Sequence, residues 1–137
     1  MSQSDEEHIK QQVLKLFQAE NPGGDREAAK KDADNILAAE GEYIPIVRAN
    51  GRPDQNREET LGMVEKSSPN RVRHVDRVHI NVVILDNRVA IALSLLPMTN
   101  GEKDPPSEES YRNMHVFRKG DDNVWRCVAW QVTKVGG

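Results

Sequence analysis

The clearest pattern of hydrophobic and polar residues lies at the C-terminal end of the chain. Two runs, residues 111–118 and 124–135, carry an aromatic or β-branched residue at almost every second position, and a polar turn at residues 119–123 separates them. This alternation is typical of an antiparallel hairpin, because alternate side chains of a strand share one face. We therefore predict a β-hairpin in this part of the chain.

The N-terminal part shows a helical period instead. Ser4 and Glu7 have the spacing of a capping box, which satisfies backbone N–H groups at the start of a helix. The apolar positions that follow share one helical face until Asn-Pro-Gly-Gly interrupts the pattern at residues 21–24. We predict a helix from about Asp5 to Glu20, with an apolar face that consists of Ile9, Val13, Leu14 and Phe17.

Two further helices are expected before most of the sheet. Asp25 can cap the second helix, which is rich in alanine and ends before Gly41. Asn56 and Glu59 have the capping-box spacing again and predict a short third helix. This third helix carries Leu61, Met63 and Val64.

Short strands are expected around and after the third helix. Residues 42–48 have the composition of a short strand, in which Pro45 belongs at an edge or a bulge because proline has no N–H to donate. From Arg71 onward the hydrophobic period is two, most clearly at residues 78–84. Asp86-Asn87 then turns the chain into the next strand.

The strand predicted at residues 88–96 is apolar on both faces. An antiparallel strand of this kind needs a cover on each side. The helices can supply one cover, and a second subunit is the simplest source of the other, so we expect a homodimer. Residues 97–107 are polar, contain Asn-Gly and Pro-Pro, and are expected to form a mobile loop.

The composition fits a single domain, residues 1–137, with residues 1–4 disordered. The 19 basic and 22 acidic residues give a net charge of −3, without the basic excess of a nucleic-acid-binding protein. No apolar run approaches the ~18 residues needed to span a bilayer. We therefore expect a cytoplasmic protein that binds neither nucleic acid nor membrane. The single cysteine, Cys127, is expected to be a buried thiol.

Several short motifs of the C-terminal half resemble a known family. Residues 107–109 are Ser-Glu-Glu, residues 115–118 are His-Val-Phe-Arg, and an Asp-containing turn precedes Trp125-Arg126. This series is similar to the Ser-Glu-Glu, Arg-Val-Trp, Asp-Gly and Trp-Gln series in the association domain of calcium/calmodulin-dependent protein kinase. Over the whole chain, the order of elements resembles the nuclear transport factor 2-like (SnoaL-like) superfamily.

The resemblance implies an α+β, cone-shaped fold in which three N-terminal helices pack on a curved antiparallel sheet and a pocket lies between them. It also implies that His115 points into the cone, together with every second residue of its strand. The association domain of the kinase binds carboxylates with arginines at positions where this chain has Ser94, His115 and Val132, so a carboxylate pocket of that type is not implied. The expected ligand-binding pocket consists of Ser94, Tyr111, Asn113, His115, Phe117, Val128, Trp130 and Val132.

The two tryptophans of the last strand are expected to differ in position. An odd number of residues separates Trp125 from Trp130, and strand residues at odd spacing point to opposite faces. We predict that Trp130 lines the cone and that Trp125 supports the fold from the other face.

His115 is the candidate for proton transfer, because imidazole titrates near neutral pH. Tyr111 and Asn113 could donate hydrogen bonds to a developing oxyanion. A reaction of this kind also needs an interior carboxylate as base, and Asp76 is the nearest candidate in the sequence.

Metal and cofactor sites are not expected. His74 and His79 are separated by an odd spacing that places them on opposite faces of a strand, and no cysteine or carboxylate completes a ligand set. The chain also has no glycine-rich phosphate loop or other cofactor motif.

Three functions therefore stay open. The leading hypothesis is a homodimeric SnoaL-like protein whose cone either binds a small apolar or amphipathic molecule or is vestigial. The alternative is an enzyme of the isomerase, cyclase or dehydratase type with His115 as acid or base, and a third hypothesis is an oligomerisation or association module. An interior carboxylate beside His115 would favour the enzyme, whereas a cavity filled by its own side chains would favour the association module.

Overall fold

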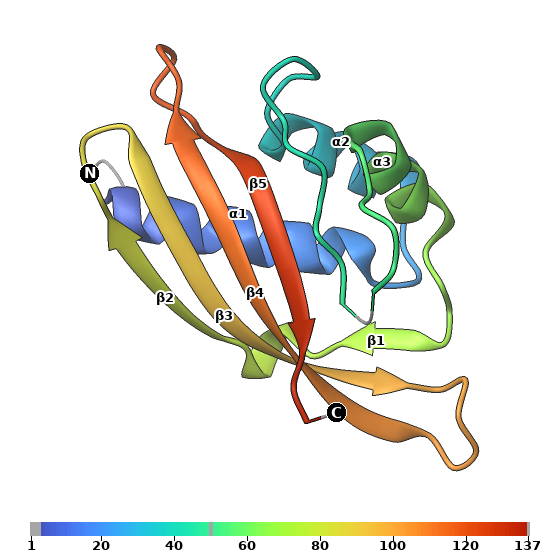
Figure 1. Ribbon diagram of the computed structural model, residues 1–137. Coiled ribbons are helices and arrows are strands. Elements are labelled where there is room, and N and C mark those ends of the chain that lie inside the picture. The colour runs from blue at the N-terminus through green and yellow to red at the C-terminus, as the bar shows by residue number, and fades with distance from the viewer. Residues whose placement is uncertain (1–3, 50, 137) are drawn as a thin grey trace.

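The computed structural model describes residues 4–49 and 51–136. Figure 1 shows α1 lying across a curved sheet, with α2 and α3 beside β5. The predicted α+β architecture, three helices followed by a curved antiparallel sheet, is confirmed. The expectation of disorder concerned residues 1–4; residues 1–3 lie outside the described residues, and Ser4 is the N-cap of α1. The elements are α1 (Asp5–Glu20), α2 (Arg26–Ile36), α3 (Arg57–Lys66), β1 (Arg71–Arg73), the short 3₁₀ helix η1 (Val75–Arg77), β2 (His79–Ile84), β3 (Val89–Asn100), β4 (Ser107–Lys119) and β5 (Trp125–Lys134).

Each helix begins where its cap residue predicts. Ser4 Oγ accepts a hydrogen bond from the N–H of Glu7 at 3.2 Å, and the carboxylate of Asp25 caps α2 in the same way. At α3 the capping box is complete, because Asn56 Oδ1 accepts from the N–H of Glu59 at 2.8 Å and Glu59 Oε1 accepts from the N–H of Asn56 at 3.1 Å. These bonds satisfy N–H groups that a helix leaves without partners at its start.

The long strand β3 organises the sheet. β2 pairs with its first part, between Ala90 and Leu95, and β1 pairs with its last three residues. β4 pairs with the other side of β3 along its whole length, and β5 pairs with β4. All four pairings are antiparallel. β1 and β2 therefore share one edge of β3, with η1 between them. β2 covers the N-terminal part of this edge, and the short strand β1 covers its C-terminal end.

The turn between β3 and β4 is shorter than the sequence indicated. β3 continues through Pro97 to Asn100, and β4 begins at Ser107, so residues 101–106 connect the strands in place of the expected loop at residues 97–107. Pro97 lies opposite Ser110 in the ladder, and its carbonyl accepts a hydrogen bond from the N–H of His74 at 2.9 Å. Proline is tolerated at this position because its contact with His74 uses the carbonyl and needs no backbone N–H. The mobility of the turn stays a prediction.

Residues 42–48 run along the edge of β5 without forming a strand. Only isolated bridges occur, and one of them joins Val47 to Gln131. The N–H of Ile44 donates to the carbonyl of Val128 at 2.8 Å, and the N–H of Val47 donates to that of Trp130 at 3.0 Å. Pro45 lies between these two donors and has no N–H of its own. The segment thus covers an edge that would otherwise expose unpaired backbone groups.

A β-bulge between β4 and β5 places the two tryptophans differently from the prediction. Val116 pairs with Ala129, whereas Phe117 pairs with Cys127, so Val128 is an additional residue in β5. An additional residue reverses the alternation of faces beyond it. Trp125 and Trp130 therefore lie on the same face, and both are buried. The prediction that they point to opposite faces was wrong because a bulge leaves no signal in the spacing.

The apolar core fills the concave face where α1 crosses the sheet. Ile9, Val13 and Phe17 of α1 are almost fully buried, as are Ala90 and Ala92 of β3. The two alanines leave room for the helix, because their side chains are short. The fully buried members of this core, by volume, include Trp125, Phe17, Phe117, Ile9, Leu16, Leu37, His115, Val13, Val64 and Cys127.

Polar contacts anchor α1 to β5 within this core. Trp125 Nε1 donates to Asp5 Oδ1 at 3.1 Å, and Gln12 Nε2 donates to the carbonyl of Trp125 at 2.9 Å. Both donors would lack partners if the helix moved away from the strand, so each bond fixes the position of α1. Among the described residues, no helix combines the length and the apolar character needed to cross a membrane.

Candidate ligand-binding cavity

A cavity of about 510 Å³ opens beyond the C-terminal end of α1. Its wall is formed by Phe17 and Glu20 of α1, Met63 of α3, Arg71 and Arg73 of β1, and the far halves of β3, β4 and β5. The connection between α2 and α3 adds Ile46, Arg48, Ala49, Arg52 and Gln55. α1 does not cover this part of the sheet, because the helix ends at Glu20. The space between sheet and loops is therefore open to a small molecule.

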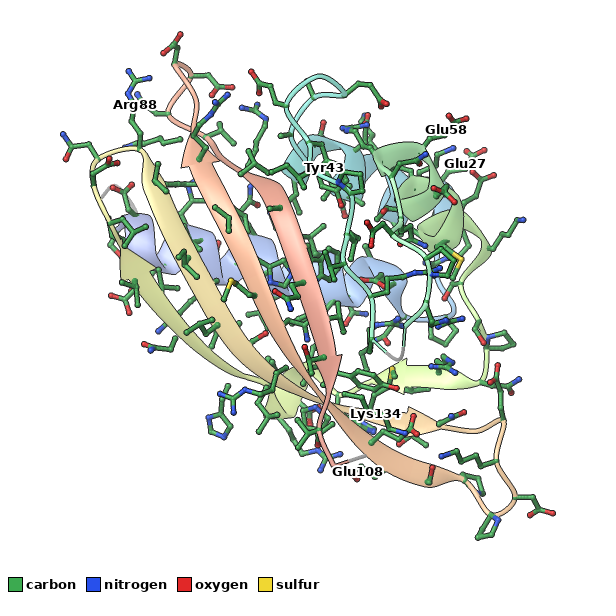
Figure 2. The ribbon with its side chains drawn as sticks, in the orientation of Figure 1. Glu27, Tyr43, Glu58, Arg88, Glu108 and Lys134 are labelled. Atoms are coloured by element: carbon green, nitrogen blue, oxygen red, sulfur yellow. The ribbon has the colours of Figure 1, made fainter. Side chains whose placement is uncertain are left out.

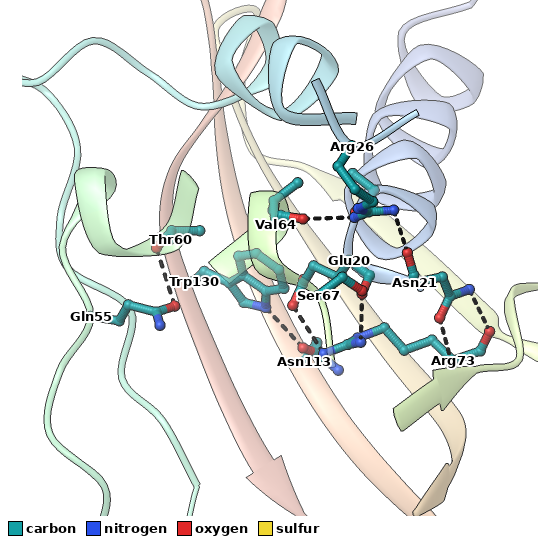
Figure 3. Close-up of polar contacts among 11 residues, drawn as sticks. Glu20, Asn21, Arg26, Gln55, Thr60, Val64, Ser67, Arg73, Asn113 and Trp130 are labelled. Atoms are coloured by element: carbon teal, nitrogen blue, oxygen red, sulfur yellow. Dashed lines mark hydrogen bonds and ion pairs between the residues drawn. The ribbon is translucent and has the colours of Figure 1, made fainter. Parts of the chain in front are cut away.

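Trp130 and Asn113 form the polar part of the cavity floor. Trp130 Nε1 donates to Asn113 Oδ1 at 2.8 Å, and both side chains are almost fully buried (Figure 3). The bond fixes the indole ring and also orients the amide, whose Nδ2 makes a long contact of 3.4 Å with the carbonyl of Tyr111. An amide nitrogen has two N–H groups. The Asn113 amide can therefore donate one hydrogen bond to a ligand.

Glu109 is a fully occupied carboxylate on the cavity wall. Its Oε1 accepts from Tyr111 Oη at 3.2 Å and from Asn100 Nδ2 at 3.3 Å, and its Oε2 contacts Lys103 Nζ at 3.0 Å and Lys134 Nζ at 2.9 Å. These donors, the Lys134 ammonium first, lower the pKa of Glu109 to about 2. A carboxylate with this pKa stays ionised and is a poor base, so Glu109 positions its neighbours.

Glu20 has the opposite electrostatic environment. Its Oε2 contacts an Arg73 guanidinium nitrogen at 3.1 Å, whereas its Oε1 is buried without a hydrogen-bond partner among the described residues (Figure 3). Burial raises the pKa of Glu20, and the nearby Arg73 charge opposes that rise. The cavity wall thus contains two carboxylates whose pKa values are shifted in opposite directions. The raised pKa makes Glu20 the candidate for acid–base chemistry, whereas Glu109 stays ionised.

Basic side chains dominate the charge of the wall. The described lining residues include six basic and only two acidic ones. Arg71 reaches Glu102 at 3.4 Å, and Arg48 Nε donates to the carbonyl of Pro53 at 2.8 Å. Within the described chain, neither Arg48 nor Arg52 has a carboxylate at ion-pair distance. We call these six residues the cationic rim: Arg48, Arg52, Arg71, Arg73, Lys103 and Lys134.

His115 lies in the core and does not line the cavity. Its ring packs 4.4 Å from the Trp130 ring and 5.5 Å from the Phe17 ring, centroid to centroid, and the residue has no exposed surface. Both ring nitrogens lack hydrogen-bond partners among the described residues. Burial lowers the pKa of His115 to about 3, so the imidazole is neutral at physiological pH. A ligand in the cavity meets Trp130 before it could meet His115.

The structure brings half of the expected pocket residues together. Tyr111, Asn113, Trp130 and Val132 line the cavity, and Ser94, His115, Phe117 and Val128 do not. Ser94 and Phe117 are buried in the core, and Val128 is the bulge residue. Asp76, the carboxylate considered as a base, is exposed on η1 and also lies outside the lining.

The sequence contained signals for some of the lining residues that were not predicted. Glu109 has the same parity as Tyr111 and Asn113 in β4, so strand alternation alone places its carboxylate in the cone. Glu20 follows Phe17 by one helical turn and shares its face of α1. The lining residues of the segment from Ile46 to Gln55 carry no such signal, because a loop has no period from which a direction can be inferred.

Other candidate chemistry lies away from the cavity or is inert. Burial raises the pKa of Cys127 to about 12, and its thiol donates to the carbonyl of Ala129, so it is a buried thiol as expected. His74 Nε2 contacts Thr99 Oγ1 at 2.7 Å, and His79 is exposed on β2. In the described part of the chain, no group of three or more metal-binding side chains is found.

Comparison with solved structures identifies the fold. A ketosteroid isomerase-like protein from Erwinia carotovora atroseptica superimposes with a TM-score of 0.65, at 15% identity over 96% of this chain and 94% of that one. A putative scytalone dehydratase from Novosphingobium aromaticivorans gives a TM-score of 0.72, at 9% identity over 96% and 85% of the two chains. The fold is nuclear transport factor 2-like.

A third structural neighbour is described as an association domain. A putative calcium/calmodulin-dependent protein kinase II association domain from Xanthomonas campestris has a TM-score of 0.61, with 16% identity over 98% of this chain and 89% of that one. Identities at this level show the nuclear transport factor 2-like fold alone. No protein-family model and no curated protein matches the sequence.

Proposed function

We propose that this chain binds a small amphipathic molecule in the cavity beyond α1. The observation that supports the proposal most directly is the open volume of about 510 Å³, which lies within the ~300–1,000 Å³ typical of small-molecule sites. Phe17, Leu96 and Trp130 supply the apolar part of the wall, while the Asn113 amide and the Glu20 carboxylate belong to its polar part. A cavity that its own side chains do not fill favours ligand binding over a pure association role.

A neutral fluorescent probe tests this proposal. Phenylnaphthylamine brightens in apolar surroundings, and we expect it to bind the wild-type chain at a single saturable site. Ala49→Trp places a large side chain at the cavity wall and should weaken binding by at least about tenfold. Ala28→Trp, on an exposed position of α2, is the matched control and should leave binding unchanged. Equal binding by the wild type and the Ala49→Trp variant would contradict the proposal.

A second candidate function is proton transfer at a carbon beside a carbonyl group. It rests on Glu20, whose raised pKa and unpartnered Oε1 suit a general base, with the Asn113 amide placed to bind the carbonyl oxygen. The sequence hypothesis assigned this role to His115, but burial behind Trp130 makes Glu20 the better candidate. Two structural neighbours are described as an isomerase-like protein and a putative dehydratase.

Deuterium exchange of β-tetralone tests the enzymatic alternative. The wild-type chain should accelerate exchange of the protons beside the ketone, and Glu20→Gln should reduce that acceleration by about 10²-fold or more, the lower end of the range for general base catalysis. His115→Leu should exchange at the wild-type rate. The opposite pattern, with loss only in the His115 variant, would restore the sequence hypothesis.

We also propose that the chain is a homodimer that uses the convex face of the sheet. Leu93 and Leu95 of β3 are each 37% exposed, and Met114 and Val83 on the neighbouring strands are also exposed. Register places Leu93 opposite Met114 and Asn81, so these side chains share the face away from the helices. Light scattering should give twice the chain mass for the wild type, and Leu93→Glu should give the monomer mass. A cytoplasmic location stays a prediction.

A further inference from the structure

We infer that the ligand of the cavity is an amphipathic anion, whose charged group the cationic rim binds while its apolar body contacts the floor. The inference rests on the proposed binding function and specifies the chemical class of the ligand. The whole chain has a net charge of −3, yet the described lining of this cavity has six basic and two acidic residues. The basic residues are thus concentrated around one opening of an otherwise acidic protein.

Three of the six rim charges are largely withdrawn from solvent. The side chains of Arg73, Lys134 and Arg71 are only 19%, 20% and 28% exposed. A charge that loses hydration needs an opposite charge nearby, because desolvation is costly. Glu20 offsets Arg73, and Glu109 offsets part of the charge on its two lysines.

The available carboxylates leave part of the rim uncompensated. Lys103 and Lys134 share the single carboxylate of Glu109, and Arg48 and Arg52 have no carboxylate partner within the described chain. Arg71 contacts Glu102 at a long 3.4 Å, and the Glu102 side chain is itself 51% exposed. An anionic group in the cavity would supply the missing counter-charge.

The four arginines of the rim come from two segments that line the same cavity. Arg71 and Arg73 are alternate residues of β1 and so point to the same side, whereas Val72 between them is exposed. Arg48 and Arg52 reach the same cavity from the segment between α2 and α3. Guanidinium groups bind the oxygens of carboxylate, sulfonate and phosphate with paired hydrogen bonds. These three anions therefore define the ligand class.

The apolar part of the lining determines the other half of the ligand. Trp130, Phe17 and Leu96 are almost fully buried, so they form the deep wall, and Arg52 and Lys103 are exposed at the opening. A molecule with an aromatic or aliphatic body and one anionic group matches this gradient. A small inorganic anion would leave the deep wall without a contact.

The test compares two probes that differ by one charged group. Anilinonaphthalene sulfonate has the skeleton of phenylnaphthylamine with a sulfonate added, so a difference in affinity reports recognition of the anion. We expect the wild-type chain to bind the sulfonate at least about tenfold more tightly, and Ala49→Trp to abolish this tight binding. Naphthaleneacetate should displace the sulfonate, and the uncharged naphthaleneacetamide and inorganic phosphate should not. Displacement by phosphate alone would identify a plain anion site without an apolar body and would overturn the inference.

A charge-removing variant and its matched control complete the test. Arg48→Gln combined with Arg71→Gln should weaken sulfonate binding by at least about tenfold more than it weakens phenylnaphthylamine binding. The control combines Arg77→Gln with Arg88→Gln, which removes two arginines from exposed ion pairs outside the cavity. Figure 2 shows Arg88 at the end of the sheet opposite Lys134. This control should bind both probes like the wild type.

The outcomes separate the inference from the proposed function. If phenylnaphthylamine binds in the cavity but the sulfonate binds no more tightly, the cavity is a binding site and the inference about the anion is wrong. Equal losses in the rim variant and the control would attribute the preference to net charge and would also overturn it. If neither probe binds, both the proposed function and the inference fail.

Discussion

The concave face of the sheet has two ends with opposite properties. At the end crossed by α1, Trp125, Phe117 and Cys127 have no exposed surface and fill the space between sheet and helix. At the other end, Tyr111 and Lys134 of the same two strands border an open cavity. One sheet therefore carries a close-packed core and a binding site side by side.

The difference arises from what covers each end. α1 presents a mostly apolar buried face from Ile9 to Ala19, interrupted only by Gln12, and the helix ends at Glu20, which lines the cavity. Beyond that point the cover consists of loops, Met63 of α3 and the short strand β1, whose inward residues are Arg71 and Arg73. Charged side chains cannot close on one another as apolar ones do, because each must keep hydration or a partner. The position of the helix terminus therefore sets the boundary between core and cavity.

The largest expected effect separates the two tryptophans. Trp125→Ala should lower the free energy of unfolding by about 3–5 kcal/mol, the usual range for a fully buried aromatic residue. Trp130→Ala should cost less, because the cavity beside Trp130 can hold water in place of the lost ring. Urea denaturation of both variants measures the difference. A larger loss for Trp130→Ala would mean that the cavity end is packed as tightly as the core.

A second expected effect concerns how the free energy of unfolding depends on pH through His115, which lies in the core at the end of the sheet crossed by α1. The unfolded His115 imidazole takes up a proton below its ordinary pKa of 6.5, but the folded one does so only near its pKa of about 3. Its contribution to stability is therefore complete above pH 6.5 and declines as the pH falls toward 3, by about 2 kcal/mol between pH 7 and pH 5. His115→Leu should lack this decline in urea denaturation at the two pH values. If the variant and the wild type lost the same amount of stability between pH 7 and pH 5, His115 would not be the cause of the decline.

The smallest effect is expected at the open end. The depressed pKa of Glu109, about 2 against an ordinary value of 4.5, stabilises the fold above pH 4.5, and this contribution is lost as the pH falls toward 2. Glu109→Gln should lower stability at pH 7 by about 1 kcal/mol, the scale of one net hydrogen bond. The deficit should shrink at pH 3, where the wild type has lost part of the same contribution. Thermal unfolding at both pH values measures it, and a constant deficit would assign the loss to packing.

The helices were predictable from sequence because their signals are local. Asn56 and Glu59 made a capping box three residues apart, and the α3 boundary followed from it. The β-hairpin was also predictable, since alternation needs only neighbouring residues. The bulge at Val128 was not predictable, because it depends on how β5 aligns with β4. That single residue determined which face Trp125 occupies.

The candidate site was only partly predictable for a related reason. Parity within β4 placed Tyr111 and Asn113 correctly in the lining, and it applied equally to Glu109. The arginines of β1 gave no comparable signal, because a short strand rich in charge has the pattern of a solvated surface. Their role depends on the fold bringing β1 opposite the segment that contains Arg48. The proximity of these two segments depends on the whole fold, so no single stretch of sequence predicts it.

The anchoring of α1 has a consequence for how the chain acquires its structure. Asp5 bonds Trp125 across a separation of 120 residues, and Gln12 bonds the same strand from 113 residues away. At a synthesis rate of roughly 5–20 residues per second, the ribosome makes the partner strand on the order of ten seconds after the helix. During that interval the apolar stripe of α1 has no sheet to cover it. Closure of the core must therefore be a late event in folding, because it joins residues that are far apart in the sequence.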